Sequence, residues 1–166
     1  MDTDTTAAKK AKTPSLETLV RLCEEIAYDR KAENILRLTL KEFSAVSDYF
    51  ILCTGTSNTH VNAIADHIRR DVLEKTGIKP IHTEGVTRDS GWTVVDYGGV
   101  MIHVMTSEKR EEYQLESLWS EAPRKDAVKR IEEKLRKKAE NKAAGASGEE
   151  KAAKTAKKAP VRKKKS

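Results

Sequence analysis

The sequence has few cysteines, few aromatic residues and no long apolar run. Its two cysteines, Cys23 and Cys53, lie in apolar runs without CxxC spacing, so we expect buried, reduced thiols rather than a disulfide or a metal site. No apolar run approaches the roughly 20 residues that span a bilayer. The polar segment 1–12 lacks the apolar core of a signal peptide. We therefore expect a soluble, cytoplasmic protein that makes no membrane contact.

The positive charge of the chain is confined to its C-terminal part. The formal net charge is +6 over 166 residues. Residues 1–123 carry 15 Lys/Arg and 20 Asp/Glu, a net of −5, whereas residues 124–166 carry 17 Lys/Arg and 6 Asp/Glu, a net of +11. The basic excess therefore belongs to an extension, and the rest of the chain is mildly acidic.

Helix and strand patterns alternate before residue 91. Ser15 is placed to cap a first helix, and Gly77 is placed to end a second one. The run from Asp48 to Thr54 is apolar on both faces, which is typical of an interior strand. The predicted elements are, in order, a helix at 15–30, strands at 34–40 and 48–54, a helix at 59–75 and a strand at 80–84.

Residues 91–105 are a dense run of β-branched and aromatic residues, broken once by Asp-Tyr-Gly-Gly at 96–99. Two β-forming runs joined by a short Gly-containing turn predict an antiparallel hairpin. Both of its faces carry apolar side chains, as in a strand pair covered on both sides of a sheet. Because side chains alternate, three sets should each share a face: Trp92, Val94 and Asp96; Thr93, Val95 and Tyr97; Met101, His103 and Met105.

The order of elements predicts a small α/β domain with a mixed sheet of about five strands flanked by helices. An amphipathic helix at 108–119 closes the domain, and Pro123 marks its edge. Asp126 is placed to cap a further helix, beyond which the Ala, Lys and Gly composition cannot support a core. The predicted organisation is a disordered segment 1–13, a domain 14–123, a helical extension 124–138 and a disordered Lys/Ala-rich tail 139–166.

Motifs for catalysis or metal binding are weak. The turn 55–58 between a strand and a helix resembles an anion cradle, but it lacks the P-loop and dinucleotide signatures. A plain turn capped by Ser57 or Asn58 is the simpler interpretation. A metal-dependent nucleotidyltransferase needs two acids on one strand face, and no predicted strand has Asp/Glu-x-Asp/Glu spacing. The four histidines do not cluster, and no Gly-x-Ser-x-Gly elbow is present. We predict no catalytic residue, metal or cofactor.

Five stretches of the chain occur in order and at matching spacing between residues 15 and 123. They are 47–61, 84–85, 91–98, 102–105 and 113–119. As a set, although not singly, they resemble the signature of the ribosomal silencing factor (Iojap-related) family.

The resemblance implies a nucleotidyltransferase-like α/β fold that has lost its catalytic carboxylates. It also implies binding to ribosomal protein fourteen of the large subunit at the intersubunit face. Bound there, the factor would block joining of the small subunit and damp translation when nutrients run short. Homodimers also occur in the family. The interaction face maps onto this sequence at Trp92, Asp96, Tyr97 and His103, with Met105 among the neighbouring sheet residues.

Two features depart from the family pattern. Gly99 stands where an acid usually follows Tyr-Gly, which removes a carboxylate from the hairpin turn. The extension after Pro123 lies outside the family core, and its net charge motivates the hypothesis that it contacts ribosomal RNA. The alternative is a solvated tail that aids solubility.

Two rival functions remain. The first is a metal-dependent nucleotidyltransferase that binds nucleotide at residues 55–58. The second is an RNA-binding accessory factor in ribosome biogenesis. Residues 15–123 show no basic face with interleaved aromatics, which disfavours a free-standing RNA-binding domain.

Overall fold

The computed structural model describes residues 13–44, 46–87 and 89–155. The chain divides into two compact units, residues 1–128 and residues 129–166. The disordered segment predicted at 1–13 lies outside the described residues except for Thr13, and residues 156–166 of the predicted tail lie outside them too.

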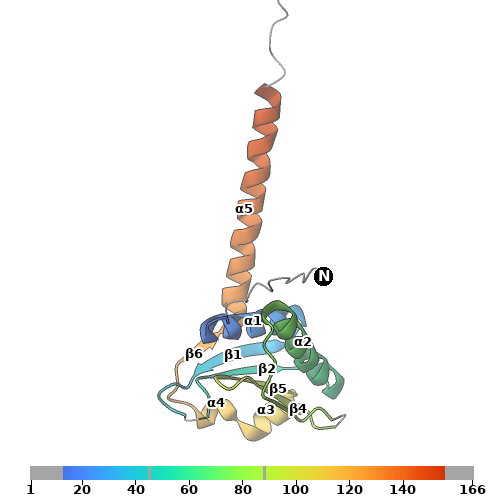
Figure 1. The fold of residues 1–166 in the computed structure, drawn as a ribbon, viewed down its shortest axis with the longest axis vertical. Coiled ribbons are helices and arrows are strands. Elements are labelled where there is room, and N and C mark those ends of the chain that lie inside the picture. Colours follow the sequence, from blue (N-terminus) through green and yellow to red (C-terminus); the bar gives the residue numbers. More distant parts are fainter. Residues whose placement is uncertain (1–12, 45, 88, 156–166) are drawn as a thin grey trace, which may run out of the picture. The chain divides into compact units, whose positions relative to one another are not determined.

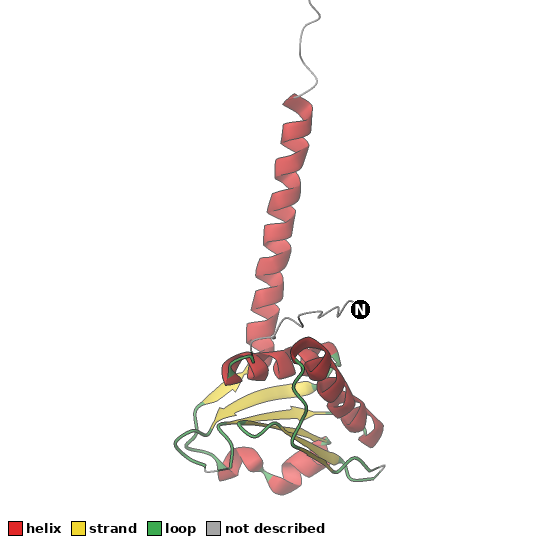
Figure 2. Cartoon of the chain, in the orientation of Figure 1, coloured by secondary structure: helices red, strands yellow, loops and turns green. Residues whose placement is uncertain are grey.

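The first unit is built on a mixed sheet, which confirms the predicted α/β class (Figures 1 and 2). The strands lie in the order β3-β4-β5-β2-β1-β6, so the sheet has six strands rather than about five. The elements are α1 (Leu16–Asp29), β1 (Glu33–Thr39), β2 (Tyr49–Thr54), α2 (Asn58–Thr76), β3 (His82–Glu84), β4 (Trp92–Asp96), β5 (Val100–Met105), α3 (Ser107–Tyr113), α4 (Leu115–Leu118), β6 (Arg124–Asp126) and α5 (Ala127–Thr155).

Helices α1 and α2 begin and end where the sequence predicts. The Ser15 hydroxyl accepts a hydrogen bond from the Thr18 amide at 3.2 Å, and the Ser57 hydroxyl accepts one from the His60 amide at 3.1 Å. Gly77 ends α2 in the left-handed conformation with φ of 73°. Figure 1 shows α1 and α2 against one face of the sheet and α3 and α4 against the other.

Strand β2 lies inside the sheet and is buried along its whole length. It pairs with β1 in the antiparallel sense and with β5 in the parallel sense. Side chains of β2 therefore pack alternately under α1 and α2 on one face and under α3 and α4 on the other. This arrangement confirms the interior strand expected from a run that is apolar on both faces.

The single helix predicted at 108–119 is wrong, because Gln114 interrupts it. Gln114 adopts a left-handed conformation with φ of 45°, and its amide donates to the Arg110 carbonyl at 3.0 Å. The Arg110 side chain then reaches across the break to Glu116 at 2.5 Å. The change of direction lets Trp119 pack edge-on against Phe50, with the ring centroids 6.3 Å apart.

The folded unit continues past Pro123, the predicted edge of the domain. Strand β6 pairs antiparallel with β1, and the Thr39 amide donates to the Pro123 carbonyl at 2.9 Å. Its Arg-Lys-Asp sequence is exposed and has no apolar alternation, so no pattern marks it as a strand. As predicted, Asp126 caps the next helix, accepting from the Val128 amide at 2.9 Å. The helix, α5, runs to Thr155, beyond the end expected near Lys138.

A buried ion pair joins β1 to α1. Arg37 is 3% exposed and Glu24 is 1% exposed. The guanidinium donates to both Glu24 carboxylate oxygens, at 2.7 and 2.8 Å, and to Glu17 at 2.7 Å. Burial opposes the charge on Arg37, but the bonds to the two carboxylates outweigh it and raise the pKa of the guanidinium. The bond from Arg37 in turn lowers the pKa of Glu17. The pair fixes α1 on the sheet.

Substituting Glu24→Gln should lower the free energy of unfolding by about 3 kcal/mol, because it leaves a buried guanidinium with incomplete compensation. Urea denaturation of the two chains measures the difference. The control is Asp66→Asn, which breaks the exposed pair between Asp66 and Arg69 and should cost under about 1 kcal/mol. Equal losses in the two variants would show that the buried pair does not anchor α1.

Candidate functional site

The structure brings four of the five predicted site residues to one face of the sheet. In the β4–β5 ladder Trp92 lies opposite Met105 and Asp96 opposite Met101, while His103 pairs with Val94. Strand alternation puts these side chains on the face that carries α3 and α4, which we call the Trp92 face. The hairpin and the division of its side chains between two faces are thus as predicted.

Tyr97 points to the opposite face. It is 8% exposed, and its hydroxyl has no hydrogen-bond partner among the described residues. Burial raises the pKa of the hydroxyl, and the positive charge of Arg69 in α2 acts in the opposite sense. Tyr97 is therefore part of the core beneath α1 and α2, and the structure does not bring it together with Trp92.

The Trp92 side chain is half-buried and is held by two aromatic neighbours. Its indole N–H donates to Nδ1 of His103 at 3.3 Å. Its ring centroid lies 4.7 Å from that of Tyr113 in a tilted arrangement and 5.8 Å from that of His103. Aromatic pairs at such separations contribute about 0.5–1.5 kcal/mol beyond their buried area. The indole is therefore held in one orientation at the surface.

His103 is 6% exposed and lies beneath Trp92, packed against Phe50 with the ring centroids 4.7 Å apart. Because Nδ1 accepts from the indole, the proton of the neutral ring is on Nε2, which has no partner among the described residues. Burial lowers the pKa of His103 to about 4, although the charge of Asp96 acts in the opposite sense. His103 is thus a neutral support for Trp92 rather than an exposed contact.

The other two predicted site residues have structural roles. Asp96 is half-buried, and its carboxylate accepts from the Gly98 amide at 2.6 Å, which closes the β4–β5 turn. Met105 is fully buried and lies directly opposite Trp92 in the pairing of β4 with β5. Of the five residues predicted to form the interaction face, only some are therefore accessible at the surface; Met105 and Tyr97 are buried.

Gly99, where the chain departs from the family pattern, lies beside α1. A Cβ atom at this position would come within 2.8 Å of the Leu16 side chain. The Gly99 carbonyl also accepts from the amides of Asp48 and Tyr49, at 3.2 and 3.1 Å. Any side chain at position 99 would displace the Leu16 side chain. The absence of a side chain therefore lets the start of α1 pack closely against the β4–β5 turn.

Tyr113 lies beside Trp92, although the sequence pattern placed it only within the amphipathic helix predicted at 108–119. It is 49% exposed and packs against Trp92 with the two rings tilted, and the Lys109 ammonium lies 5.7 Å from its ring centroid. The sequence signal was present, since Tyr113 begins one of the five family-like stretches. What could not be foreseen was the break at Gln114, which ends α3 beside the tyrosine.

The turn 55–58 is engaged in internal bonds. The Thr56 amide donates to Nδ1 of His60 at 3.1 Å, and the His60 amide donates to the Ser57 hydroxyl. Nε2 of His60 then donates to the Arg30 carbonyl at 2.8 Å. Two amides that an anion cradle would offer already have acceptors. The interpretation as a capped turn, with Ser57 as the cap, is confirmed.

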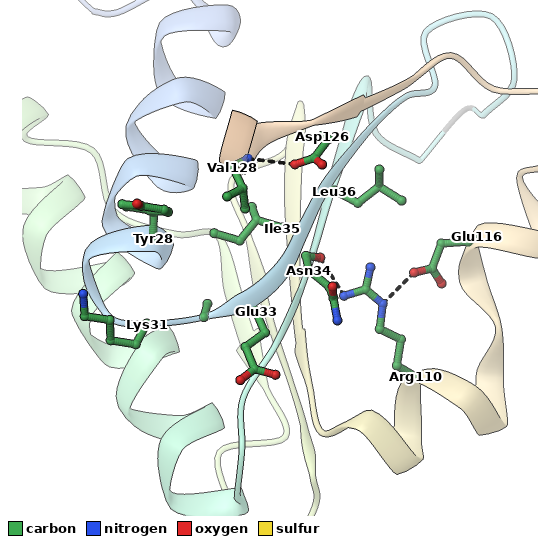
Figure 3. A pocket seen from close by; sticks show the side chains of 11 residues that line it. Tyr28, Lys31, Glu33, Asn34, Ile35, Leu36, Arg110, Glu116, Asp126 and Val128 are labelled. Atoms are coloured by element: carbon green, nitrogen blue, oxygen red, sulfur yellow. Dashed lines mark hydrogen bonds and ion pairs between the residues drawn. The ribbon is translucent and has the colours of Figure 1, made fainter. Parts of the chain in front are cut away.

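A cavity of about 920 Å³ opens beside the first half of β1 (Figure 3). Arg110 projects into it, but its guanidinium already donates to Glu116, to the Asn34 carbonyl at 2.8 Å and to the Thr54 hydroxyl at 2.9 Å. Arg110 therefore connects the junction between α3 and α4 to the beginning of β1 and the end of β2. The lining is a mixture of both charge signs and apolar residues, namely Tyr28, Lys31, Ala32, Glu33, Asn34, Ile35, Leu36, Arg110, Glu116, Asp126 and Val128.

Other reactive groups offer little chemistry. Burial raises the pKa of the Cys53 thiol to about 12 and raises that of Cys23 as well, so neither is a ready nucleophile. Among the described residues there is no cluster of three His, Cys, Asp or Glu side chains that could hold a metal ion. Within the same part of the chain, no helix combines the length and the apolar character that crossing a bilayer requires.

A family model described as "Ribosomal silencing factor during starvation" matches residues 13–158. This span includes β4, β5 and the whole of the Trp92 face. The chain belongs to the ribosomal silencing factor family.

Relatives and solved structures agree with this assignment. The chain is 36% identical over 110 residues to Ribosomal silencing factor RsfS of Bacillus subtilis, covering 66% of this chain and 92% of that protein. It is 36% identical over 76 residues to a mouse protein named "Mitochondrial assembly of ribosomal large subunit protein 1", covering 45% and 33%. A crystal structure from Chromobacterium violaceum matches with a TM-score of 0.61 and 29% identity, covering 64% of this chain and 88% of that one.

The buried His103 should make the stability of this silencing factor family member depend on pH. Its ordinary pKa is 6.5 and its folded value is about 4. Between these values the unfolded chain binds a proton that the folded chain excludes. The free energy of unfolding should therefore fall as the pH is lowered through this window, by up to roughly 3 kcal/mol.

Urea denaturation at pH 7 and pH 4.5 measures this loss. His103→Gln should remove most of it, whereas the exposed His82→Gln should leave it unchanged. The same pH dependence in His103→Gln as in the wild type would mean that His103 is not buried in its neutral form.

Proposed function

We propose that this chain binds ribosomal protein fourteen of the large subunit through the Trp92 face and thereby blocks joining of the small subunit. Translation would fall when nutrients are limited. The observation that supports this function is the Trp92–Tyr113 pair, an exposed aromatic anchor fixed by His103 in a member of the silencing factor family. The protein would act in the cytoplasm, where the ribosomes are.

Blocking a docking surface requires occupancy and not turnover, so no catalytic group is needed. A specific protein interface buries about 1,200–2,000 Å² in total, and a few central Trp and Tyr residues commonly carry most of its energy. A rigid indole also loses little conformational freedom on binding. The net charge of −5 on residues 1–123 suits a basic ribosomal surface, because complementary charge accelerates association.

The name of the mouse relative favours a second candidate, a role in assembly of the large subunit. Such a factor would use the same face on an immature particle. The two candidates differ in the step affected: a silencing factor acts on finished subunits, whereas loss of an assembly factor leaves precursor particles. The nucleotidyltransferase alternative receives less support, since two amides of the turn 55–58 are already bonded.

Replacing Trp92 with alanine should abolish most binding to purified large subunits, with a loss on the order of 2 kcal/mol or more. Co-sedimentation measures the binding, and circular dichroism verifies the fold. The control is Leu73→Ala, which trims an exposed apolar residue of α2, on the other side of the sheet.

In a subunit-joining assay, wild-type protein in excess should prevent formation of whole ribosomes from separated subunits, and Trp92→Ala should not. Subunits that join equally well in the presence of either protein would refute the silencing mechanism. Light scattering on the free protein separately measures whether it forms the homodimer implied by the family resemblance.

For the C-terminal extension we propose an accessory contact with ribosomal RNA, supported by its net charge of +11 over residues 124–166. Because β6 completes the sheet, the informative truncation ends at Val128 rather than at Pro123. The logarithm of large-subunit affinity should fall more steeply with salt for the full chain than for residues 1–128, since each phosphate contact releases counterions. Equal slopes for the two chains would leave the extension as a solvated tail.

A further inference from the structure

Strand β3 contributes a side chain to the Trp92 face. Glu84 in β3 lies directly opposite Val94 in β4, and Val94 lies opposite His103 in β5. Residues directly opposite each other in an antiparallel pair point to the same side of the sheet. The three side chains therefore form a row across the Trp92 face, which we call the Glu84 row. Trp92 is its neighbour, because it precedes Val94 by two residues in the same strand.

The Glu84 row changes from exposed to buried across the sheet. Glu84 is exposed, Val94 is half-buried and His103 is buried. The Glu84 carboxylate has no hydrogen bond or ion pair among the described residues. Asp96, the carboxylate in the residue set implied by the family resemblance, instead accepts from the Gly98 amide and closes the β4–β5 turn. Glu84 is thus the more accessible negative charge on these strands.

Acidic side chains also border the Trp92 face on the side of α3. Glu108, Glu111 and Glu112 are all exposed in this helix. Glu112 pairs with Lys109 at 2.7 Å, whereas the other two have no ion-pair partner within the described part of the chain. The indole of Trp92 therefore lies between the Glu84 carboxylate on one side and the acids of α3 on the other. A partner that covers the indole must approach two negatively charged borders.

We propose that Glu84 determines the specificity of the Trp92 face by pairing with a lysine or arginine side chain of the partner, which packs on Val94 and Trp92. The identity of that partner as a ribosomal protein rests on the proposed function, whereas its basic character follows from the Glu84 row. The long stem of such a side chain covers apolar surface while its charged head stays at the polar rim. The indole ring also attracts a cation placed over its face.

The same geometry disfavours other partners. An acidic side chain at this position would be repelled by Glu84, and an apolar one would cover the carboxylate without compensating its charge. Discrimination between partners comes from such unfavourable contacts as much as from the favourable one. Trp92 supplies affinity for any surface that can bury an indole, and Glu84 restricts the choice to a surface with a cation beside it.

The test compares two full-length variants that each lose one exposed carboxylate. Glu84→Gln removes it from the Glu84 row, and Glu74→Gln removes it from α2, on the opposite face of the sheet. Both variants have the same net charge, so a difference between them reports the position of the carboxylate. Biolayer interferometry on immobilised large subunits, over a series of salt concentrations, gives the affinity and both rate constants. Circular dichroism verifies the fold.

Glu84→Gln should bind on the order of tenfold more weakly and with a smaller dependence on salt, because a charge-assisted contact is lost. Glu74→Gln should stay within about threefold of the wild type. Glu84→Asp, which keeps the charge, should bind more tightly than Glu84→Gln. Equal binding by the two Gln variants and the wild type would overturn the role of Glu84 and leave the proposed function intact. No binding by the wild type would overturn the proposed function and this inference together.

Discussion

Parallel pairing of β2 with β5 determines where every other element of the folded unit can lie. The pair forms the centre of the sheet, and both strands are almost wholly buried. Two helices cover one face and the shorter α3 and α4 cover the other (Figure 1). Because α3 and α4 are short, they leave part of the second face open. The surface available for a partner is thus the area that these helices do not cover.

Within that open area, the exposed group and the buried group have different tasks. Trp92 presents its indole at the surface, and His103 fixes the indole from below by accepting its N–H. A histidine that is kept neutral by burial can serve as an acceptor throughout the physiological pH range. Under the proposed function, partner binding would then depend on a core residue that does not itself touch the partner. This division explains why the residue set implied by the family resemblance is wider than the exposed surface.

The sequence was sufficient for the parts of the fold that rest on apolar periodicity and capping. Helices α1 and α2, the interior strand β2 and the β4–β5 hairpin all carry such patterns. The sequence pattern did not predict the parts of the fold in which the backbone conformation depends on contacts between residues far apart in the chain. The left-handed Gln114 depends on Arg110 reaching Glu116 and β1, and β6 depends on pairing with a strand 85 or more residues earlier in the chain. Of the site, the family resemblance grouped Trp92 with His103, and the β4–β5 register puts both on one face. The burial of Met105 and Tyr97 depended on which helices cover each face.

The two outermost strands of the sheet are short and polar: Arg-Lys-Asp in β6 and His-Thr-Glu in β3. An exposed edge is a template for another chain, and natural proteins protect such edges with charge and brevity. Both edge strands of this sheet follow that rule. The apolar pattern of the sequence does not predict β6, because its three residues are all charged. Growth of the sheet by addition of a second molecule is therefore disfavoured at either end. Two copies of this chain would therefore not be expected to associate by continuing the sheet from one molecule into the next.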